Sequence, residues 1–129
     1  MNKITIYIKF AKFTYFFIFY KNLTTGAIER ISVNIIGEQA NAESYKPYFS
    51  ADGSRVVFVS SASNLIVGDT NNVADIFVKD LQTKEVIRVN TTKLGVQANG
   101  SSDDAVFSQD GTKILFTSEA SNLVDNDTN

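Results

Sequence analysis

The feature that most constrains this chain is an internal repeat with a period of 58 residues. Residues 41–58 (NAESYKPYFSADGSRVVF) match residues 99–116 (NGSSDDAVFSQDGTKILF), and the ungapped match aligns residues 23–71 with residues 81–129. Of these 49 aligned pairs 21 are identical, which is far above chance for an alignment without gaps. Repeat proteins bury the apolar surface of each unit against the neighbouring units. We therefore expect the chain to fold as stacked units.

Within one repeat, short strand-like runs alternate with polar turns. Runs rich in β-branched and aromatic residues predict strands over residues 15–21, 27–33, 45–50, 55–60, 74–80, 85–89, 104–108 and 113–119. An Asp-Gly pair follows two of these runs, at Asp52 and Asp110, and such pairs accept the positive φ angles of hairpin turns. No stretch shows a sustained apolar period of about 3.6 residues, so we expect little helix. Four antiparallel strands per repeat predict an all-β fold of four-stranded β-propeller blades, with about two blades in this chain, a partial propeller.

The strand and turn motif also resembles a known family. Residues 48–60 (YFSADGSRVVFVS) and 106–118 (VFSQDGTKILFTS) resemble the WD-like repeat of TolB-type and prolyl-oligopeptidase-type bacterial propellers, usually P-x-F-S-P-D-G-x-x-I-x-F-x-S. The resemblance covers residues 18–129, and the rest of the unit is similar to a longer variant found in bacterial surface and secreted proteins. It implies a periplasmic or extracellular location, and it implies binding, assembly and enzyme-gating roles alike. Propellers of this family have more blades than this chain encodes, so we expect a fragment.

The repeat divides the chain into two predicted parts. Residues 18–129 form the partial TolB-like propeller, with repeat units at residues 23–80 and 81–129. Residues 1–17 are an atypical N-terminal segment. Residues 1–20 contain five of the ten phenylalanines, three of the five tyrosines and no acidic residue, which is not the composition of the repeat.

This N-terminal segment has three interpretations. An apolar, lysine-containing N-terminus can be an export signal or can contact a membrane, although Lys9 and Lys12 interrupt the apolar run that a spanning helix needs. The alternation of Ile4, Ile6 and Ile8 with more polar residues instead predicts a β-strand. The third interpretation is non-family sequence in a truncated or frame-shifted gene. We favour a strand in a chain that is a gene fragment.

The composition excludes several kinds of catalytic and binding site. The chain has no cysteine and no histidine, which excludes disulfides, cysteine-ligated metals, the Ser-His-Asp triad and histidine-based general acids and bases. The G-x-S-x-G elbow of α/β-hydrolases is also absent. A net charge of -2 gives no electrostatic footprint for nucleic acid. We therefore predict that the chain is not an enzyme and does not bind nucleic acid.

One loop has the spacing of a metal site. Asp69, Asn71 and Asp75 occupy positions 1, 3 and 7 of the loop that starts at Asp69 (DTNNVAD), and calcium sites use oxygen side chains at alternate positions. The EF-hand pattern is incomplete, because Ala74 stands at position 6 instead of Gly and Asp80 at position 12 instead of Glu. The sequence therefore supports either a calcium loop or a structural turn between two strands. We predict no other cofactor.

Other polar residues have structural and functional interpretations. Asp52 and Asp110 are either paired carboxylates or turn residues, and their recurrence with the repeat favours turns. Ser60 resembles a nucleophile, but the sequence offers no evident base to activate it. Arg30 and Arg88 recur at the repeat period, and we expect them to bind carboxylate partners or, preferably, to bridge acidic loops between blades.

These observations lead to three hypotheses of function. The favoured one is a non-catalytic binding or scaffold module that presents residues 61–73 and 92–102 to a protein or glycan partner. The alternative is a fragment of the propeller domain of a larger hydrolase, such as a prolyl-oligopeptidase-type peptidase. In the third, copies of the chain assemble into a homo-oligomer, and residues 15–21 and 27–33 of one copy complete the C-terminal half-blade of the next.

Overall fold

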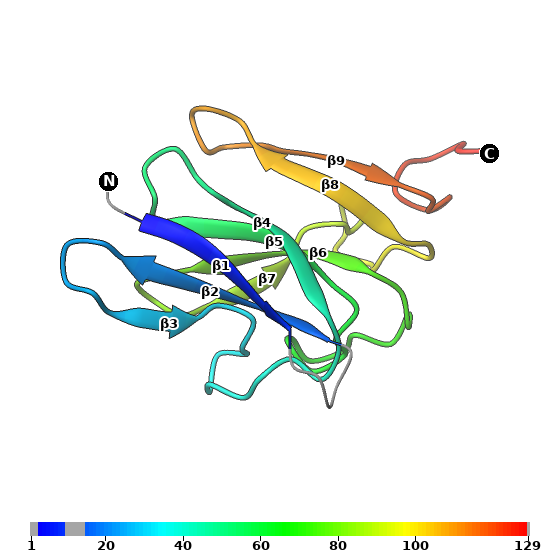
Figure 1. The fold of residues 1–129 in the computed structure, drawn as a ribbon. Coiled ribbons are helices and arrows are strands. Elements are labelled where there is room, and N and C mark those ends of the chain that lie inside the picture. The colour runs from blue at the N-terminus through cyan, green and yellow to red at the C-terminus, as the bar shows by residue number, and fades with distance from the viewer. Residues whose placement is uncertain (1–2, 10–14, 129) are drawn as a thin grey trace.

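In the computed structural model, which describes residues 3–9 and 15–128, the chain consists of β-strands joined by turns and loops, and this part contains no helix. The strands are β1 (Lys3–Lys9), β2 (Phe16–Asn22), β3 (Ile28–Arg30), β4 (Ser44–Phe49), β5 (Arg55–Ser60), β6 (Asp75–Asp80), β7 (Val86–Arg88), β8 (Ser102–Phe107) and β9 (Ile114–Ser118). They pair antiparallel in chain order within three sheets, β1-β2-β3, β4-β5-β6-β7 and β8-β9 (Figure 1). The predicted all-β fold is therefore confirmed.

The two Asp-Gly turns form as predicted. Gly53 has a φ of 71°, and Asp52 Oδ1 accepts hydrogen bonds from Ser50 Oγ (2.7 Å) and from the Ser54 N–H (2.9 Å). The turn at Asp110 repeats this arrangement. These hydrogen bonds stabilise the carboxylate form and lower the pKa of Asp52 and of Asp110 to about 2. Both side chains therefore act as turn residues, as the recurrence with the repeat predicted.

Loop contacts also recur at the repeat period. The Asn41 N–H donates to Asn64 Oδ1 (2.9 Å), and Asn64 Nδ2 donates to the Gln39 carbonyl (2.9 Å). Fifty-eight residues later, the Asn99 N–H donates to Asn122 Oδ1 (3.0 Å), and the Asn122 side chain makes the equivalent bond. The two copies in the sequence thus use the same side chains to fasten the loop after the second strand to the segment before the first.

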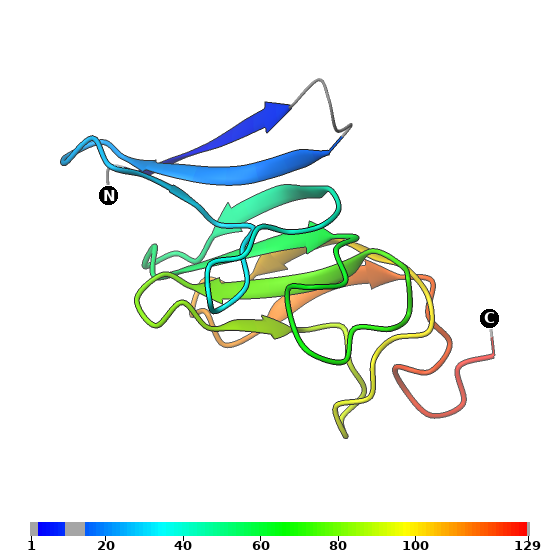
Figure 2. The same ribbon diagram turned by 90° about the horizontal axis from the view of Figure 1, so that it is seen from below.

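The four-stranded sheet lies between the other two sheets, and each of its faces buries one apolar cluster (Figure 2). The cluster against β2 and β3 comprises Ile18, Ile31, Ala40, Val56, Phe58, Ala62, Leu65 and Phe77. The cluster against β8 and β9 comprises Val57, Val59, Ile76, Val78 and Ala105, with Ile114 and Phe116 packed on it. Alternate residues of β5 and β6 face opposite clusters, as the two-residue period of a strand requires.

The N-terminal segment pairs with the rest of the chain as a strand. β1 runs antiparallel to β2 from Lys3 opposite Asn22 to Lys9 opposite Phe16, in agreement with the predicted alternation. Residue Lys12, which entered the membrane interpretation, lies outside the described residues. In the part of the chain that the structure describes, no helix has the length and apolar character needed to cross a bilayer.

Candidate functional site

The three predicted calcium ligands lie close together, and an arginine lies among them. Arg88, the last residue of β7, places Nη1 3.3 Å from Asp69 Oδ1 and 3.4 Å from Asp75 Oδ2. The exposed fractions of these side chains are 8% for Arg88, 3% for Asp69 and 0% for Asp75. The group is therefore a buried cluster with two carboxylates and one guanidinium.

Two asparagines complete the surroundings of Asp75. Asn71 Nδ2 lies 3.0 Å and Asn90 Nδ2 2.6 Å from Asp75 Oδ1, and both donate to it. Asn90 Oδ1 in turn accepts a bond from the Ile76 N–H (2.9 Å). The sequence did not indicate Arg88 or Asn90 as members of this cluster. The recurrence of Arg30 and Arg88 was a signal for the arginine, but it did not identify the partners.

The cluster holds the loop between β5 and β6 against β7. Arg88 was expected to bind carboxylate partners or, preferably, to bridge acidic loops between blades; it binds Asp75 of its own four-stranded sheet and Asp69 of the loop between β5 and β6. A cation seated at these oxygens would have to displace the guanidinium, which already neutralises part of their charge. Among the residues described, no group of three or more acidic or histidine side chains is arranged to hold a metal ion. Calcium binding by Asp69, Asn71 and Asp75 stays a prediction.

The cluster gives a specific pH dependence at Asp69. Burial, and then the charge of Asp75, raise the pKa of the Asp69 carboxyl, while Arg88 opposes this shift. Because the pKa of Asp69 is raised in the folded state, the free energy of unfolding falls as the pH rises through that pKa. We expect Asp69→Asn to raise the melting temperature near neutral pH and to lessen its fall as the pH rises above about 4, the ordinary pKa of an aspartate.

Asp52→Asn is the control for this measurement, because its pKa is shifted in the opposite direction. Asp52 stabilises the fold as a carboxylate, so its contribution is present above the ordinary pKa and is lost as the pH falls. In circular dichroism melting curves near neutral pH, the melting temperature should therefore rise in Asp69→Asn and fall in Asp52→Asn. A melting temperature that falls equally in both variants would contradict the assigned role of Asp69.

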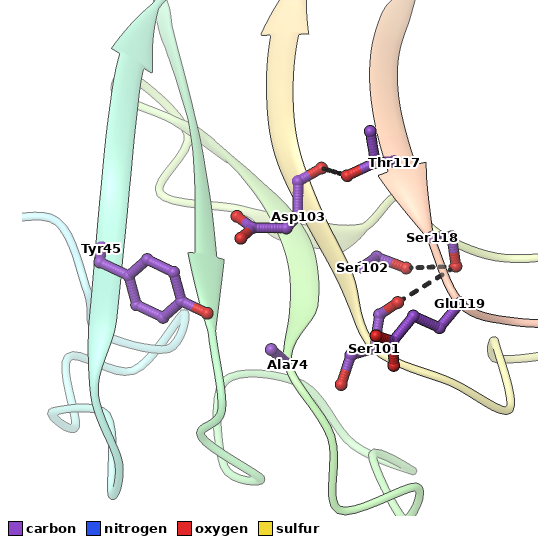
Figure 3. Close-up of a pocket in the computed structure, with 8 residues that line it drawn as sticks. All are labelled: Tyr45, Ala74, Ser101, Ser102, Asp103, Thr117, Ser118 and Glu119. Carbon is purple, nitrogen blue, oxygen red and sulfur yellow. Dashed lines mark hydrogen bonds between the residues drawn. The ribbon is translucent and has the colours of Figure 1, made fainter.

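A second candidate is a polar cleft of about 300 Å³ between β4 and the β8-β9 pair. Figure 3 shows Tyr45 pointing from β4 toward Asp103 on β8, with hydroxyl side chains along β8 and β9. Ser102 Oγ donates to Ser118 Oγ (2.9 Å), and Thr117 Oγ1 donates to the Asp103 carbonyl (3.1 Å). Burial and the charge of Asp103 raise the pKa of Tyr45, so its phenol stays protonated. These hydrogen bonds join neighbouring strands, and we assign them a structural role.

The serine and the second arginine of the sequence analysis lie apart from this cleft. Ser60 is buried. Its Oγ donates a hydrogen bond to the Glu43 carbonyl (3.0 Å) and accepts one from Ser44 Oγ (2.9 Å). The Arg30 side chain donates to Gln39 Oε1 (2.6 Å), and its guanidinium carbon lies 5.3 Å from the centre of the Phe17 ring. Each side chain thus joins neighbouring segments of its own part of the fold.

Two open apolar grooves are the third candidate, and they lie at equivalent positions of the repeat. The first, of about 600 Å³, is lined by residues 34–38, residues 64–67 and the start of β7. The second, of about 710 Å³, is lined by residues 92–96 and 122–125. With an offset of 58, the two loops that line the second groove are those that line the first. Residues 61–73 and 92–102 were predicted to face a partner, whereas residues 34–38, which the offset relates to residues 92–96, were not.

The groove walls expose large apolar side chains on well-defined turns. Val67 is 101%, Leu94 90%, Ile36 76% and Val124 68% exposed. In the first groove, Asn34 Oδ1 accepts bonds from the N–H groups two and four residues later (3.1 and 2.9 Å), and in the second Thr92 Oγ1 does the same (3.2 and 3.1 Å). A capping side chain at the same place in both copies therefore presents Ile36 and Leu94 to solvent.

No protein-family model matches the chain, and no curated protein matches it.

Proposed function

We propose that this chain is a non-catalytic binding module built from β-propeller blades, and that its two apolar grooves bind a protein partner. The observation that carries the proposal is the repetition of an exposed apolar groove, lined by the same two loops, in both copies of the repeat. Exposed apolar side chains that gather in one concave place are typical of protein-binding surfaces. The antiparallel four-stranded sheet β4-β5-β6-β7, in chain order, is consistent with one blade.

The charges beside the grooves suggest how a partner is chosen. Glu38 and Glu85 lie at the first groove, whereas Lys93 and Asp125 lie at the second. A partner that places one apolar side chain in each groove gains from both contacts, since the second contact forms at high effective concentration. The acidic first groove favours a basic residue beside its anchor. The proposed partner is therefore a protein segment with two apolar anchors, the first of which is flanked by Lys or Arg.

This function can be tested with a displayed library of random peptides selected on the full chain. We expect the selected peptides to be rich in apolar anchors, and Ile36→Ser and Leu94→Ser to weaken their binding at least about tenfold, because an anchor pocket is lost. Both side chains are exposed, so the melting temperature should remain close to that of the unchanged chain.

The control is Leu23→Ser, which removes a large apolar side chain, 54% exposed, that lines neither groove. Peptide binding should be unchanged in this variant. Equal weakening by Leu23→Ser would show that the peptides recognise exposed apolar surface without using the grooves, and it would reject the proposal.

A further inference from the structure

β1 lies outside the sequence repeat, yet it occupies a repeat position in space. Across the β5-β6 pair, Arg55 is opposite Asp80, and across the β1-β2 pair, Lys3 is opposite Asn22. Asn22 is the repeat equivalent of Asp80, because the two lie 58 residues apart. β1 therefore takes the place beside β2 that β5 takes beside β6, and both strands begin opposite the equivalent residues Asn22 and Asp80.

β9 is the repeat equivalent of β5, but its outer edge is open. β4 and β6 pair with the two edges of β5, and its residues 56–59 are buried in the apolar clusters on the two faces of the sheet. Among the described residues, β9 pairs with β8 alone, and Leu115 is 74% exposed. An open edge of this kind presents unpaired N–H and C=O groups to an incoming strand.

The hydrogen bonds to β8 show which residues of β9 face the open edge. The Lys113 carbonyl accepts a bond from the residue after β8 (2.9 Å), and the Glu119 N–H donates one to the residue before β8 (2.8 Å). Backbone groups alternate in direction along a strand, so those of Ile114, Phe116 and Ser118 point away from β8.

β2 has the complementary pattern on the edge that β1 covers. The Ile18 carbonyl accepts a bond from the Ile31 N–H (2.7 Å) on the β3 side. The backbone groups of Phe17, Phe19 and Lys21 therefore point toward β1. Paired in the register of β5 and β6, β9 of another copy would place Phe116 opposite Phe19, with both sets of backbone groups directed at each other.

We propose that β1 is an exchangeable edge strand, and that β1 and the β9 strand of a second copy of this chain compete for the same edge of β2. When β9 of a second copy replaces β1, an intermolecular antiparallel sheet forms from β8 and β9 of one copy and β2 and β3 of the other. Its strand order, β8-β9-β2-β3, is equivalent to β4-β5-β6-β7. One antiparallel pairing is lost and an equivalent one is gained, as in other strand-addition and domain-swapping reactions.

An exposed region at the β7 edge of the four-stranded sheet supports a second copy as the occupant. Ile87 on β7 is opposite Val78, so both side chains lie on the face toward β8 and β9, yet Ile87 is 51% exposed. The β2 and β3 strands of a second copy would extend the β8-β9 sheet over this region. Lys79 lies between the first sheet and the four-stranded sheet, where its Nζ donates to the Val33 carbonyl (3.1 Å). Its repeat equivalent, Lys21 of the second copy, would lie at the equivalent place between the four-stranded sheet and the new sheet.

Engineered disulfides test this pairing directly, since the chain has no cysteine of its own. The register places Leu115 of one copy opposite Tyr20 of another, so the double variant Leu115→Cys/Tyr20→Cys should form disulfide-linked oligomers on oxidation. Thr117→Cys/Tyr20→Cys is the control, because it lies on the same strands two residues out of register. Equal cross-linking of the two variants, or none in either, would overturn the proposal.

Proline substitutions in β1 test the competition. The register places the Ile6 N–H toward β2 and the Thr5 N–H away from it, so Ile6→Pro should weaken β1 pairing while Thr5→Pro leaves it intact. Light scattering should show a larger average mass for Ile6→Pro at the same concentration. An unchanged mass with native circular dichroism would count against a role for β1.

A third variant covers the case in which Ile6→Pro does not fold. Thr5 is paired with Tyr20, so the disulfide of Thr5→Cys/Tyr20→Cys would fix β1 on β2 within one chain. We expect the reduced form to associate as concentration rises and the oxidised form to stay monomeric. Association of the oxidised form as strong as that of the reduced form would overturn the competition between β1 and β9.

Discussion

Replacement of Arg88 with methionine is expected to lower the free energy of unfolding by about 3–5 kcal/mol. Methionine keeps much of the length of arginine but removes the positive charge between Asp69 and Asp75. Two buried carboxylates then face each other without a cation, and such uncompensated charges are costly in a medium of low polarity. Urea unfolding curves followed by circular dichroism measure the loss.

Arg30→Met is the matched control, because Arg30 is the repeat equivalent of Arg88 and forms no ion pair with a carboxylate among the described residues. Its guanidinium donates to Gln39 and lies against the rings of Phe17 and Phe19. We expect this variant to lose only about 1 kcal/mol. Equal losses in the two variants would show that the charge of Arg88 is not what stabilises the loop.

A double variant separates charge from packing at the same site. Asp69→Asn/Arg88→Met retains one carboxylate of the cluster, so it should be more stable than Arg88→Met alone. If packing against Arg88 were the main contribution, the two variants would be equally unstable. The order of the two midpoints in urea therefore distinguishes the two causes.

Local signals in the sequence were sufficient for the strands and the turns. The run RVVFVS became β5, and the turns at Asp52 and Asp110 formed because an aspartate can satisfy its own backbone N–H groups. The alternation in residues 3–9 likewise indicated a strand. These features depend on residues that lie next to one another in the chain, and the sequence shows such neighbours directly.

The candidate sites depend on contacts that the sequence does not show. Isoleucine and leucine are usually buried in a core, so the sequence gives no sign that Ile36 and Leu94 are exposed. Their exposure follows from how the loops pack. The loop that contains Asp69 was identified, but its partner Arg88 lies on a strand beyond another turn. The pairing of the strands could not be predicted either, because alternation indicates a strand without indicating which neighbouring strand it pairs with.

The largest contrast between equivalent residues is expected at two phenylalanines. Phe58 on β5 is fully buried and stacks against Phe77 with ring centres 5.9 Å apart, whereas its repeat equivalent Phe116 on β9 is only partly buried. Phe58→Ala should lower the free energy of unfolding by about 3–5 kcal/mol, through lost burial and the cavity left behind. Phe116→Ala should cost about 1 kcal/mol, because water already reaches that side chain.

Urea unfolding of the two variants at low protein concentration measures this contrast. If the two variants lost similar amounts of unfolding free energy, β9 would be covered in solution to the same extent as β5. The same experiment at high concentration also bears on strand exchange. If β9 pairs with β2 of a second copy, Phe116 becomes buried as Phe58 is, and the cost of Phe116→Ala should rise with concentration while that of Phe58→Ala stays constant.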